Sequence, residues 1–285
     1  MAGFRILFIL ASNHAGSHLL AERLAADPQC LAVGELANLR KFLGRRGPSS
    51  SGTDSSYGSD PLYAGLSALP ETVWHQTIWE RRGRQFGTLI DNSKRLDWLC
   101  RTRDAAASVH VVHLLRDPRA FVHRVGSILA SDRALRTQRW RECRRQLQPR
   151  LLWASRAEVF AWRWLRENRG IADFLLRQDM PAARVSYEEL IAAPKSTVER
   201  LFADFGLPSF QLHEAHAAIA ASPTFKPAWR DQGAAPEPDL RWLEELSQES
   251  QAAVLELAPL RAFLAGLGYR MGPEGLMPLA EPVGA

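Results

Sequence analysis

Short runs of aliphatic and β-branched residues recur along the chain, and each is followed by a turn and then by a stretch with helical periodicity. A continuous apolar run of this length is typical of a strand that is buried in a parallel sheet. Val109–Leu115 gives the strongest such pattern. The predicted strands are Phe4–Leu10, Leu31–Val33, Phe86–Ile90, Val109–Leu115 and Ala183–Ser186.

Strands that alternate with helices predict an α/β fold, in which a parallel sheet is flanked by helices on both faces. The predicted helical stretches include Leu19–Ala26, Leu36–Leu43, Lys195–Phe205 and Leu240–Leu264, the last broken at Pro259. Ligands of such sheets bind at the carboxyl ends of the strands. The loops to examine are therefore those that follow Leu10, Ile90, Leu115 and Ser186.

The chain has 285 residues and no internal repeat, which indicates a single domain over residues 1–285. Gly47–Asp60 is rich in Ser and Gly, so it is predicted to be a mobile loop. It is either a plain surface insertion or a lid beside a substrate cleft. The Pro/Gly-rich tail, residues 272–285, is predicted to be frayed.

Composition excludes several classes of protein. With 46% hydrophobic and 24% charged residues, the chain is not a disordered tail. Its longest uncharged apolar run is Ile6–Ala11, whereas a membrane span needs about 20 residues. The three cysteines lie far apart without metal-ligand spacing, so we expect no zinc site and a cytoplasmic location.

Arginine dominates the basic residues, since only four of the 36 are lysines, and the net charge is +5. This excess reflects either nucleotide bias in the genome or an anionic ligand, which arginine binds in bidentate fashion. Arg133–Arg169 alone holds eleven arginines and several tryptophans. A nucleic-acid surface, with cations on phosphates and tryptophans stacked on bases, is one interpretation of this segment. The helical spacing of Trp153, Phe160 and Trp164 instead favours core packing beside a solvated basic face, so no nucleic-acid partner is predicted.

The first loop has the composition of a phosphate-binding loop. Its small residues, Ala15–Ser17, let backbone N–H groups approach an anion, and the following helix adds the positive end of its dipole. The GxxxxGK[ST] pattern of nucleoside triphosphatases is absent. One 5′-phosphate without a metal fits this loop better than a triphosphate. A purely structural turn remains an alternative.

A second motif, Arg116–Ala120 (RDPRA), follows the strongest predicted strand. Arg116 at the end of that strand would place a cation above the sheet. Asp117 is suited to cap the next helix, with Pro118 in its first turn. A capping turn flanked by solvated arginines is an equally good interpretation of this motif alone.

Taken together and in this order, these motifs resemble the PAPS-dependent sulfotransferase family, where PAPS is 3′-phosphoadenosine 5′-phosphosulfate. The family pattern is a first loop [R/K]-S-G-[S/T]-[S/T], then RDPRA, then YEDL…P and FxGL. The matching segments here are His14–His18, Arg116–Ala120, Tyr187–Leu190 with Pro194, and Phe205–Leu207. Ile90–Lys94 is similar to the IDxSK of the bacterial and carbohydrate-directed branches. The resemblance implies a P-loop-containing nucleotide-binding core of the sulfotransferase type.

The resemblance also implies roles. The first loop would hold the 5′-phosphosulfate, Arg116 the 3′-phosphate, and Tyr187 would lie against the adenosine. Lys94 would neutralise charge on the leaving group, and Glu35 resembles the catalytic base of the protein-tyrosine branch. The implied cofactor-binding residues are Asn13, His14, Ala15, Gly16, Ser17, His18, Arg116, Arg124, Tyr187 and Lys226, and the implied catalytic residues are Glu35, Lys94 and His14.

The sequence departs from the family pattern in its first loop and after the RDPRA motif. His14 stands where the family has Arg or Lys, and a reference pKa of about 6.5 makes its charge variable near neutral pH. Either His14 donates a proton to the leaving group, or Lys94 acts alone. His18 replaces a small hydroxyl residue, and Arg124 stands where a Ser is expected.

The resulting hypothesis is a sulfotransferase that moves a sulfuryl group from PAPS to a hydroxyl, or less often an amine, of a small molecule, glycan, lipid or peptide. No metal and no membrane span are predicted. The alternatives are a non-catalytic relative that binds PAP (3′-phosphoadenosine 5′-phosphate, the product) or another nucleotide, and a phosphoryl transferase on the same core. Glu35 has an alternative too, since it is placed to cap the helix that begins near Leu36.

Overall fold

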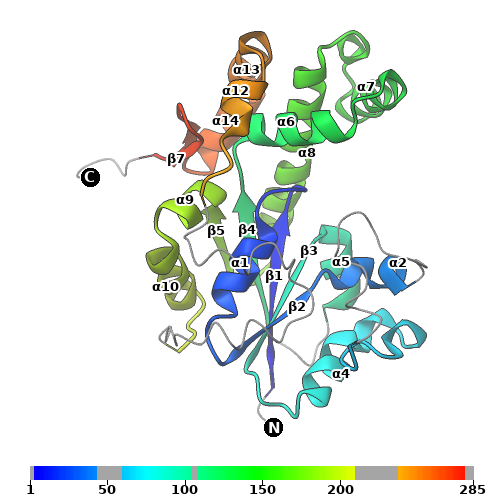
Figure 1. Ribbon diagram of the computed structural model, residues 1–285, viewed down its shortest axis with the longest axis vertical. Coiled ribbons are helices and arrows are strands. Elements are labelled where there is room, and N and C mark those ends of the chain that lie inside the picture. The colour runs from blue at the N-terminus through cyan, green and yellow to red at the C-terminus, as the bar shows by residue number, and fades with distance from the viewer. Residues whose placement is uncertain (1–2, 44–59, 104–107, 209–236, 280–285) are drawn as a thin grey trace.

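The computed structural model describes residues 3–43, 60–103, 108–208 and 237–279. Their centre is a five-stranded parallel sheet in the order β2-β3-β1-β4-β5 (Figure 1). The strands are β1 (Arg5–Ala11), β2 (Cys30–Gly34), β3 (Thr88–Lys94), β4 (Ser108–Leu115) and β5 (Ala182–Ser186). All five predicted strands are present and every neighbouring pair is parallel, which confirms the predicted α/β fold.

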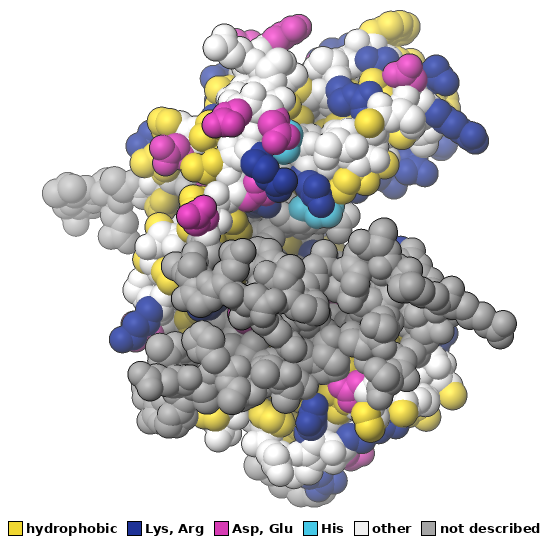
Figure 2. All heavy atoms as spheres, viewed as in Figure 1, with side chains coloured by type: hydrophobic (Ala, Val, Ile, Leu, Met, Phe, Trp, Pro, Cys, Tyr) yellow, Lys and Arg dark blue, Asp and Glu magenta, His cyan; other side chains and the backbone are white. Residues whose placement is uncertain are grey.

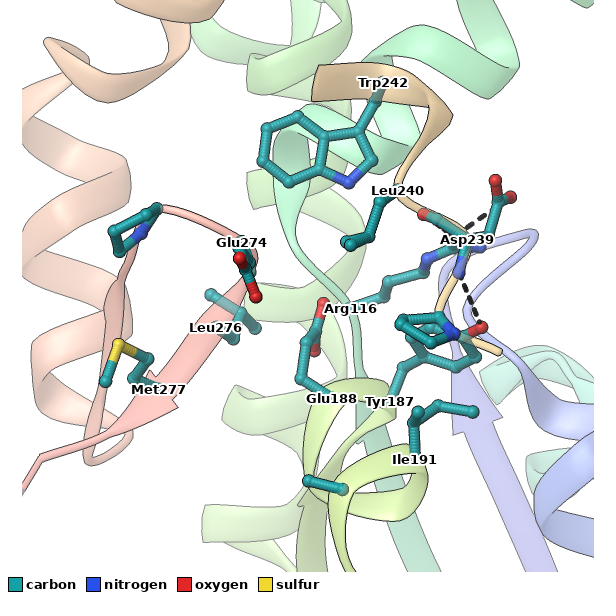
Figure 3. A pocket seen from close by; sticks show the side chains of 14 residues that line it. Arg116, Tyr187, Glu188, Ile191, Asp239, Leu240, Trp242, Glu274, Leu276 and Met277 are labelled. Atoms are coloured by element: carbon teal, nitrogen blue, oxygen red, sulfur yellow. Dashed lines mark hydrogen bonds and ion pairs between the residues drawn. The ribbon is translucent and has the colours of Figure 1, made fainter. Parts of the chain in front are cut away.

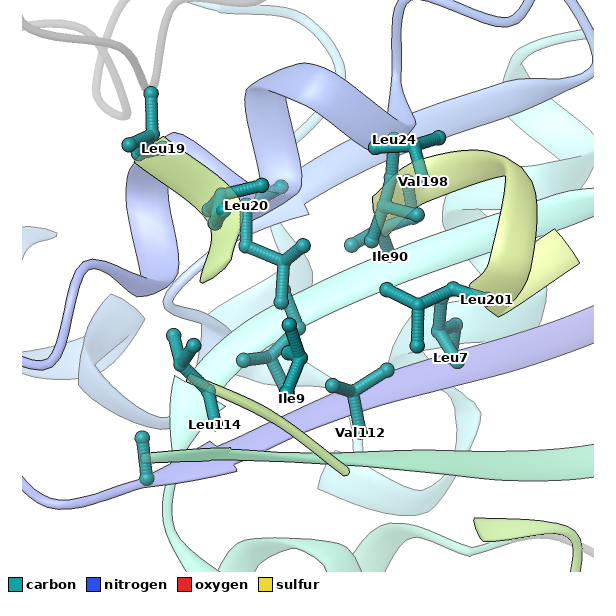
Figure 4. Packing of buried hydrophobic residues seen from close by; sticks show 14 of the residues in the cluster. Leu7, Ile9, Leu19, Leu20, Leu24, Ile90, Val112, Leu114, Val198 and Leu201 are labelled. Carbon is teal, nitrogen blue, oxygen red and sulfur yellow. The ribbon is translucent and has the colours of Figure 1, made fainter. Parts of the chain in front are cut away.

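Helices cover both faces of the sheet, because side chains on a buried strand alternate between its faces. Leu7 and Ile9 of β1 pack under α1 (Ser17–Leu24) and α10 (Pro194–Asp204), as Figure 4 shows. Phe8 of β1 lies on the opposite face, in a cluster with residues of α4 (Trp74–Arg81) and α5 (Leu96–Thr102). The remaining short elements near the sheet are η1 (Leu36–Asn38), α2 (Leu39–Leu43), η2 (Leu66–Ala68), η3 (Glu71–Val73) and α9 (Tyr187–Ala192).

A third apolar cluster joins the helices beyond the carboxyl end of β4. Its elements are α6 (Pro118–Ile128), η4 (Pro149–Leu152), α8 (Arg156–Arg177), α13 (Gln248–Leu255) and α14 (Ala258–Gly266), with α7 (Asp132–Gln146) and α12 (Arg241–Glu245) beside them. The α6 helix begins as the sequence predicted, because Asp117 caps it through the Arg119 N–H at 2.7 Å and Pro118 lies in its first turn.

The Arg/Trp-rich segment packs only in part as expected. Trp162 and Trp164 are buried in α8, whereas Trp153 is 78% exposed and Trp140 is 56% exposed. Core packing was therefore a wrong prediction for Trp153. The basic side chains of α7 do lie at the surface, where Figure 2 shows Lys and Arg gathered at the upper right.

The C-terminal region differs from the prediction in two ways. Three helices, α12, α13 and α14, replace one broken helix, and Pro259 lies in the first turn of α14 instead of interrupting a helix. The tail is not frayed from residue 272, because β7 (Leu276–Pro278) pairs antiparallel with β6 (Tyr269–Met271) and Leu276 is buried. The predicted loop at residues 47–60 lies, apart from Asp60, outside the described residues.

No helix of the described ranges is both long enough and apolar enough to cross a membrane.

Candidate active site

The first loop connects the central strand β1 to the N-terminus of α1. Gly16 precedes the helix with φ of 92°, in the left-handed region that favours glycine. A Cβ atom at Gly16 would lie 2.6 Å from Cδ2 of Tyr187, so the ring of Tyr187 leaves no room for a side chain. His14 also has a positive φ, of 64°, a conformation that is uncommon for a residue other than glycine. The loop thus directs the N-terminus of α1 toward the carboxyl edge of the sheet.

Glu35 and Lys94 meet beside this loop. Glu35 follows β2 and Lys94 ends β3, and the ammonium group of Lys94 forms an ion pair with Oε1 of Glu35. His18, in the first turn of α1, places its Nε2 2.9 Å from the same oxygen. Oε2 accepts a hydrogen bond from the side-chain amide of Asn38 at 2.6 Å. Both Glu35 oxygens are therefore bonded.

The carboxylate of Glu35 makes no side-chain capping bond to the helix that follows it. The carboxylate instead contacts Lys94 and His18, so the structure does not support the interpretation of Glu35 as a helix cap. Asn92 donates from its side-chain amide to Nδ1 of His18 at 3.1 Å. With Nδ1 accepting, Nε2 carries the ring proton and donates it to Glu35.

Asp91 holds the segment that carries Lys94. Its carboxylate is completely buried and accepts hydrogen bonds from the Ser93 N–H and hydroxyl, from Trp98 Nε1 at 2.8 Å and from His75 Nε2 at 2.9 Å. The Ser93 hydroxyl in turn accepts from the Ala37 N–H at 3.1 Å, in the turn after Glu35. Asp91 and Ser93 belong to the Ile90–Lys94 motif, but only the structure shows that their network ties the Lys94 segment to the Glu35 segment.

These contacts set the charge of Glu35. Burial alone would raise the pKa of this carboxyl, but the hydrogen bond from His18 and the positive charge of Lys94 outweigh burial and lower the pKa to about 2. Glu35 is thus a fixed carboxylate, held by a cation at the edge of the sheet.

Positive charge surrounds His14. Neighbouring protein atoms remove water from part of the His14 imidazole, although the residue as a whole is exposed. Arg124, Lys94 and Arg116 add positive charge around the ring. Loss of hydration and this positive charge lower the pKa of His14 to about 4. The expectation of a His14 that is partly charged near neutral pH is therefore wrong, because its neighbours repel the imidazolium form.

Arg116 is anchored at the edge of β4. One guanidinium nitrogen donates to the carbonyl oxygen of His14 at 2.8 Å, and the other lies 3.2 Å from Oδ2 of Asp239. Its guanidinium also stacks on the ring of Tyr187, 4.4 Å from the centroid. Hydrogen bonds from Arg241 and the charge of Arg116 hold the pKa of Asp239 well below its ordinary value. The sequence predicted the position of Arg116 but not that it pairs with Asp239.

A cavity opens beside Arg116. Its volume of about 520 Å³ lies within the usual range for small-molecule sites. Figure 3 shows Tyr187 and Ile191 below it, Trp242 and Leu240 above it, and the hairpin residues Leu276 and Met277 to its left. Of these lining residues, the sequence assigned only Tyr187 to the nucleotide, since α12 and the β6–β7 hairpin reach this place only through the tertiary fold.

The other residues that the sequence predicted to bind the cofactor lie in or near the first loop, in α6, or outside the described residues. Ala15 and Ser17 are buried in the loop, and Asn13 is exposed. Arg124 is an exposed residue of α6 whose charge reaches His14. Lys226 lies outside the described residues. Among the described residues, no group of three or more His, Cys, Asp or Glu side chains is placed to hold a metal ion.

Comparison with known proteins gives the family. The model of the sulfotransferase family matches residues 7–211, so the chain belongs to this family of transferases. This confirms the family, the nucleotide-binding core that it implies and the enzyme class that the motifs predicted. No curated protein matches the chain.

Several solved structures are similar to the chain. The sulfotransferase domain from the curacin biosynthetic pathway shares 18% identity, over 90% of this chain and 98% of that one, with a TM-score of 0.48. The sulfotransferase domain of the Synechococcus PCC 7002 olefin synthase shares 16%, over 90% and 96%, with a TM-score of 0.49. The Alicyclobacillus acidocaldarius sulfotransferase shares 17%, over 91% and 95%, with a TM-score of 0.42. The family assignment rests on the family model alone.

The charge around His14 can be tested by titration. We expect NMR of its ring C–H signals to give a pKa near 4, and Arg124→Ala to raise it, because removal of a nearby cation favours the imidazolium form. Arg133→Ala, an exposed arginine of α7, is the matched control and leaves the pKa unchanged. A wild-type pKa near 6.5 that Arg124→Ala does not move would contradict this description of the loop.

Proposed function

We propose that this sulfotransferase uses PAPS and transfers its sulfuryl group to a hydroxyl, or an amine, of an acceptor molecule. The observation that carries the proposal is the meeting of one fixed carboxylate, Glu35, with a set of cations at the first loop. Sulfuryl transfer needs both features: a group that accepts the proton of the acceptor, and positive charge where the leaving group becomes negative.

The residues fit PAPS as a ligand. Lys94, Arg116 and Arg124 gather positive charge around His14, which suits a phosphosulfate at the N-terminus of α1. The cavity beside Arg116 has room for a nucleoside. The loop sequence His14–His18 lacks the Lys-Ser/Thr pair that a metal-bound triphosphate requires, which disfavours a phosphoryl transferase.

PAPS, when bound, supplies the sulfuryl group, whose bond to the phosphate oxygen breaks as a new bond to the acceptor oxygen forms. Glu35 takes the proton of the acceptor hydroxyl. Lys94 moves its ion pairing from Glu35 toward the charge that develops on the leaving group. Because Glu35 then loses its cation, its pKa rises during the transfer and it becomes a stronger base.

The two histidines of the loop take different roles in this proposal. His18 is a positioning residue, since it donates to Glu35 and is itself held by Asn92. His14 binds no proton near neutral pH in its cationic surroundings. With an anionic phosphosulfate beside it, the imidazole of His14 would have a higher pKa, and His14 would then take up a proton and donate it to the leaving group.

The three cysteines are free thiols, one of them exposed, which supports a reducing compartment such as the cytoplasm as the site of action. The acceptor, of whatever class, would approach from the Glu35 side of the loop, opposite the cavity beside Arg116.

A first test concerns Glu35. We expect Glu35→Gln to bind PAP normally but to transfer sulfate from PAPS at least about a hundredfold more slowly, because general-base catalysis contributes roughly 10²–10⁴-fold. Sulfate transfer to a panel of hydroxyl and amine acceptors measures this. Glu80→Gln, a solvent-facing glutamate of α4, is the control and keeps the wild-type rate.

Equal rates in Glu35→Gln and wild type would remove Glu35 from the mechanism. Wild-type protein that binds PAP but transfers no sulfate to any acceptor would instead favour the non-catalytic relative.

A second test concerns Arg116. Calorimetry should show that wild type binds PAP more tightly than AMP, and that Arg116→Ala loses this preference, because charge-assisted contacts to the 3′-phosphate are lost. Arg116→Lys should keep only part of it, since lysine lacks the bidentate fork. An unchanged preference in a folded Arg116→Ala protein would show that another residue holds the 3′-phosphate.

A further inference from the structure

Glu188 is a half-buried acid that the proposed mechanism does not use. It follows Tyr187 in α9, and its Oε1 accepts a hydrogen bond from the Asp117 N–H at 3.0 Å. Its Oε2 is buried without a hydrogen-bond partner among the described residues. A buried polar atom without a hydrogen-bond partner costs free energy. A ligand atom that forms a hydrogen bond with Oε2 would therefore be stabilising.

Glu188 belongs to the wall of the cavity beside Arg116. Figure 3 shows its carboxyl group pointing upward into the space between Arg116 and Leu276. The hairpin presses on it from the far side, since a Cβ at Gly275 would lie 2.5 Å from Cγ of Glu188. The side chain is therefore held against the hairpin, with its carboxyl group at the wall of the cavity.

We propose that Glu188 is a specificity-determining residue for the nucleotide: its Oε2 hydroxyl donates a hydrogen bond to a ring nitrogen of the adenine base of PAPS or PAP. This inference rests on the proposed function. If the phosphates lie at the first loop and Arg116, the base reaches this cavity. There Trp242, Leu240 and Ile191 provide apolar walls, as nucleotide pockets require.

The protonation state supports the proposal. Burial, and then the negative charge of Asp117, raise the pKa of Glu188 to about 7. Because Oε1 is occupied as an acceptor, the proton of the neutral acid lies on Oε2 and makes it a donor. A ring nitrogen of adenine is an acceptor, so the neutral acid matches it and the carboxylate repels it.

Other charged groups near Glu188 are already engaged or lie at the rim. Asp117 pairs with Arg119, and Arg116 pairs with Asp239. Glu189 accepts from the Ser186 N–H and lies within ion-pair distance of Arg200. Glu274, from the hairpin, is exposed at the mouth of the cavity, and Tyr269 bonds to Glu189.

The test is the pH dependence of PAP binding, measured by calorimetry between pH 6 and pH 8.5. In wild type, the Kd of PAP should rise roughly tenfold from pH 7 to pH 8.5, because Oε2 loses its proton and with it the donor. Glu188→Gln should keep tight binding at pH 8.5, since its amide donates at every pH and still accepts from the Asp117 N–H. Titration of His14 and of the phosphates is common to both proteins and cancels in the comparison.

Glu274→Gln is the matched control, because it removes a carboxylate from the rim of the same cavity and should leave the pH profile of wild type unchanged. A Glu188→Gln profile equal to that of wild type overturns the inference while the proposed function stands. Wild-type protein that binds no PAP at any pH contradicts the proposed function and this inference with it.

Infrared difference spectroscopy of the wild type needs no variant. Addition of PAP at pH 8 should increase the carbonyl band of a protonated carboxyl group, because binding favours the neutral acid. Absence of that increase overturns the inference even where Glu188→Gln does not fold.

Discussion

The proposed site depends on the hydrogen bonds that surround the buried carboxylate of Asp91. A carboxylate without water is stable only when donors surround it, and Asp91 has donors from its own strand end, from α5 and from α4. These bonds fix the end of β3, where Lys94 takes a positive φ of 66°. The same network reaches the turn after Glu35 through Ser93. The largely buried ion pair between Lys94 and Glu35 thus rests on a fully buried network beneath it.

The strand order divides the carboxyl edge of the sheet into two halves around β1. Strands β2 and β3 bring Glu35 and Lys94 to one side of the first loop. Strands β4 and β5 bring Arg116 and Tyr187 to the other side, beside the cavity. The loop itself therefore lies between the proposed proton acceptor and the proposed nucleoside pocket. In-line transfer needs this arrangement, because the acceptor oxygen must enter on the side of the sulfuryl group opposite to the departing oxygen.

Local patterns in the sequence predicted more of the sheet than of the site. Each strand is a continuous apolar run, so all five could be recognised one at a time. Glu35, Lys94 and Arg116 could be placed at the edge of the sheet because each follows such a run. The partner of Arg116 could not be recognised, since the Arg116–Asp239 pair joins residues 123 positions apart.

Local sequence patterns also could not predict the protonation states or the hairpin near the end of the chain. The low pKa of His14 depends on loss of hydration and on three cations from different elements, and the raised pKa of Glu188 depends on burial under a hairpin. That hairpin was predicted as frayed because Gly and Pro dominate its composition, yet Leu276 is buried against the helices of the third cluster. Burial of one apolar residue therefore overrides a loop-like composition.

The central claim is that Lys94 and Glu35 act as one coupled unit in sulfuryl transfer. A double-mutant cycle on the single-turnover rate of sulfate transfer from PAPS tests it most directly, with Lys94→Met, Glu35→Gln and the double variant. If the two residues act as a unit, the double variant loses about as much rate as the worse single variant. Losses that multiply, so that the double variant is slower by the product of the two single effects, would contradict the claim.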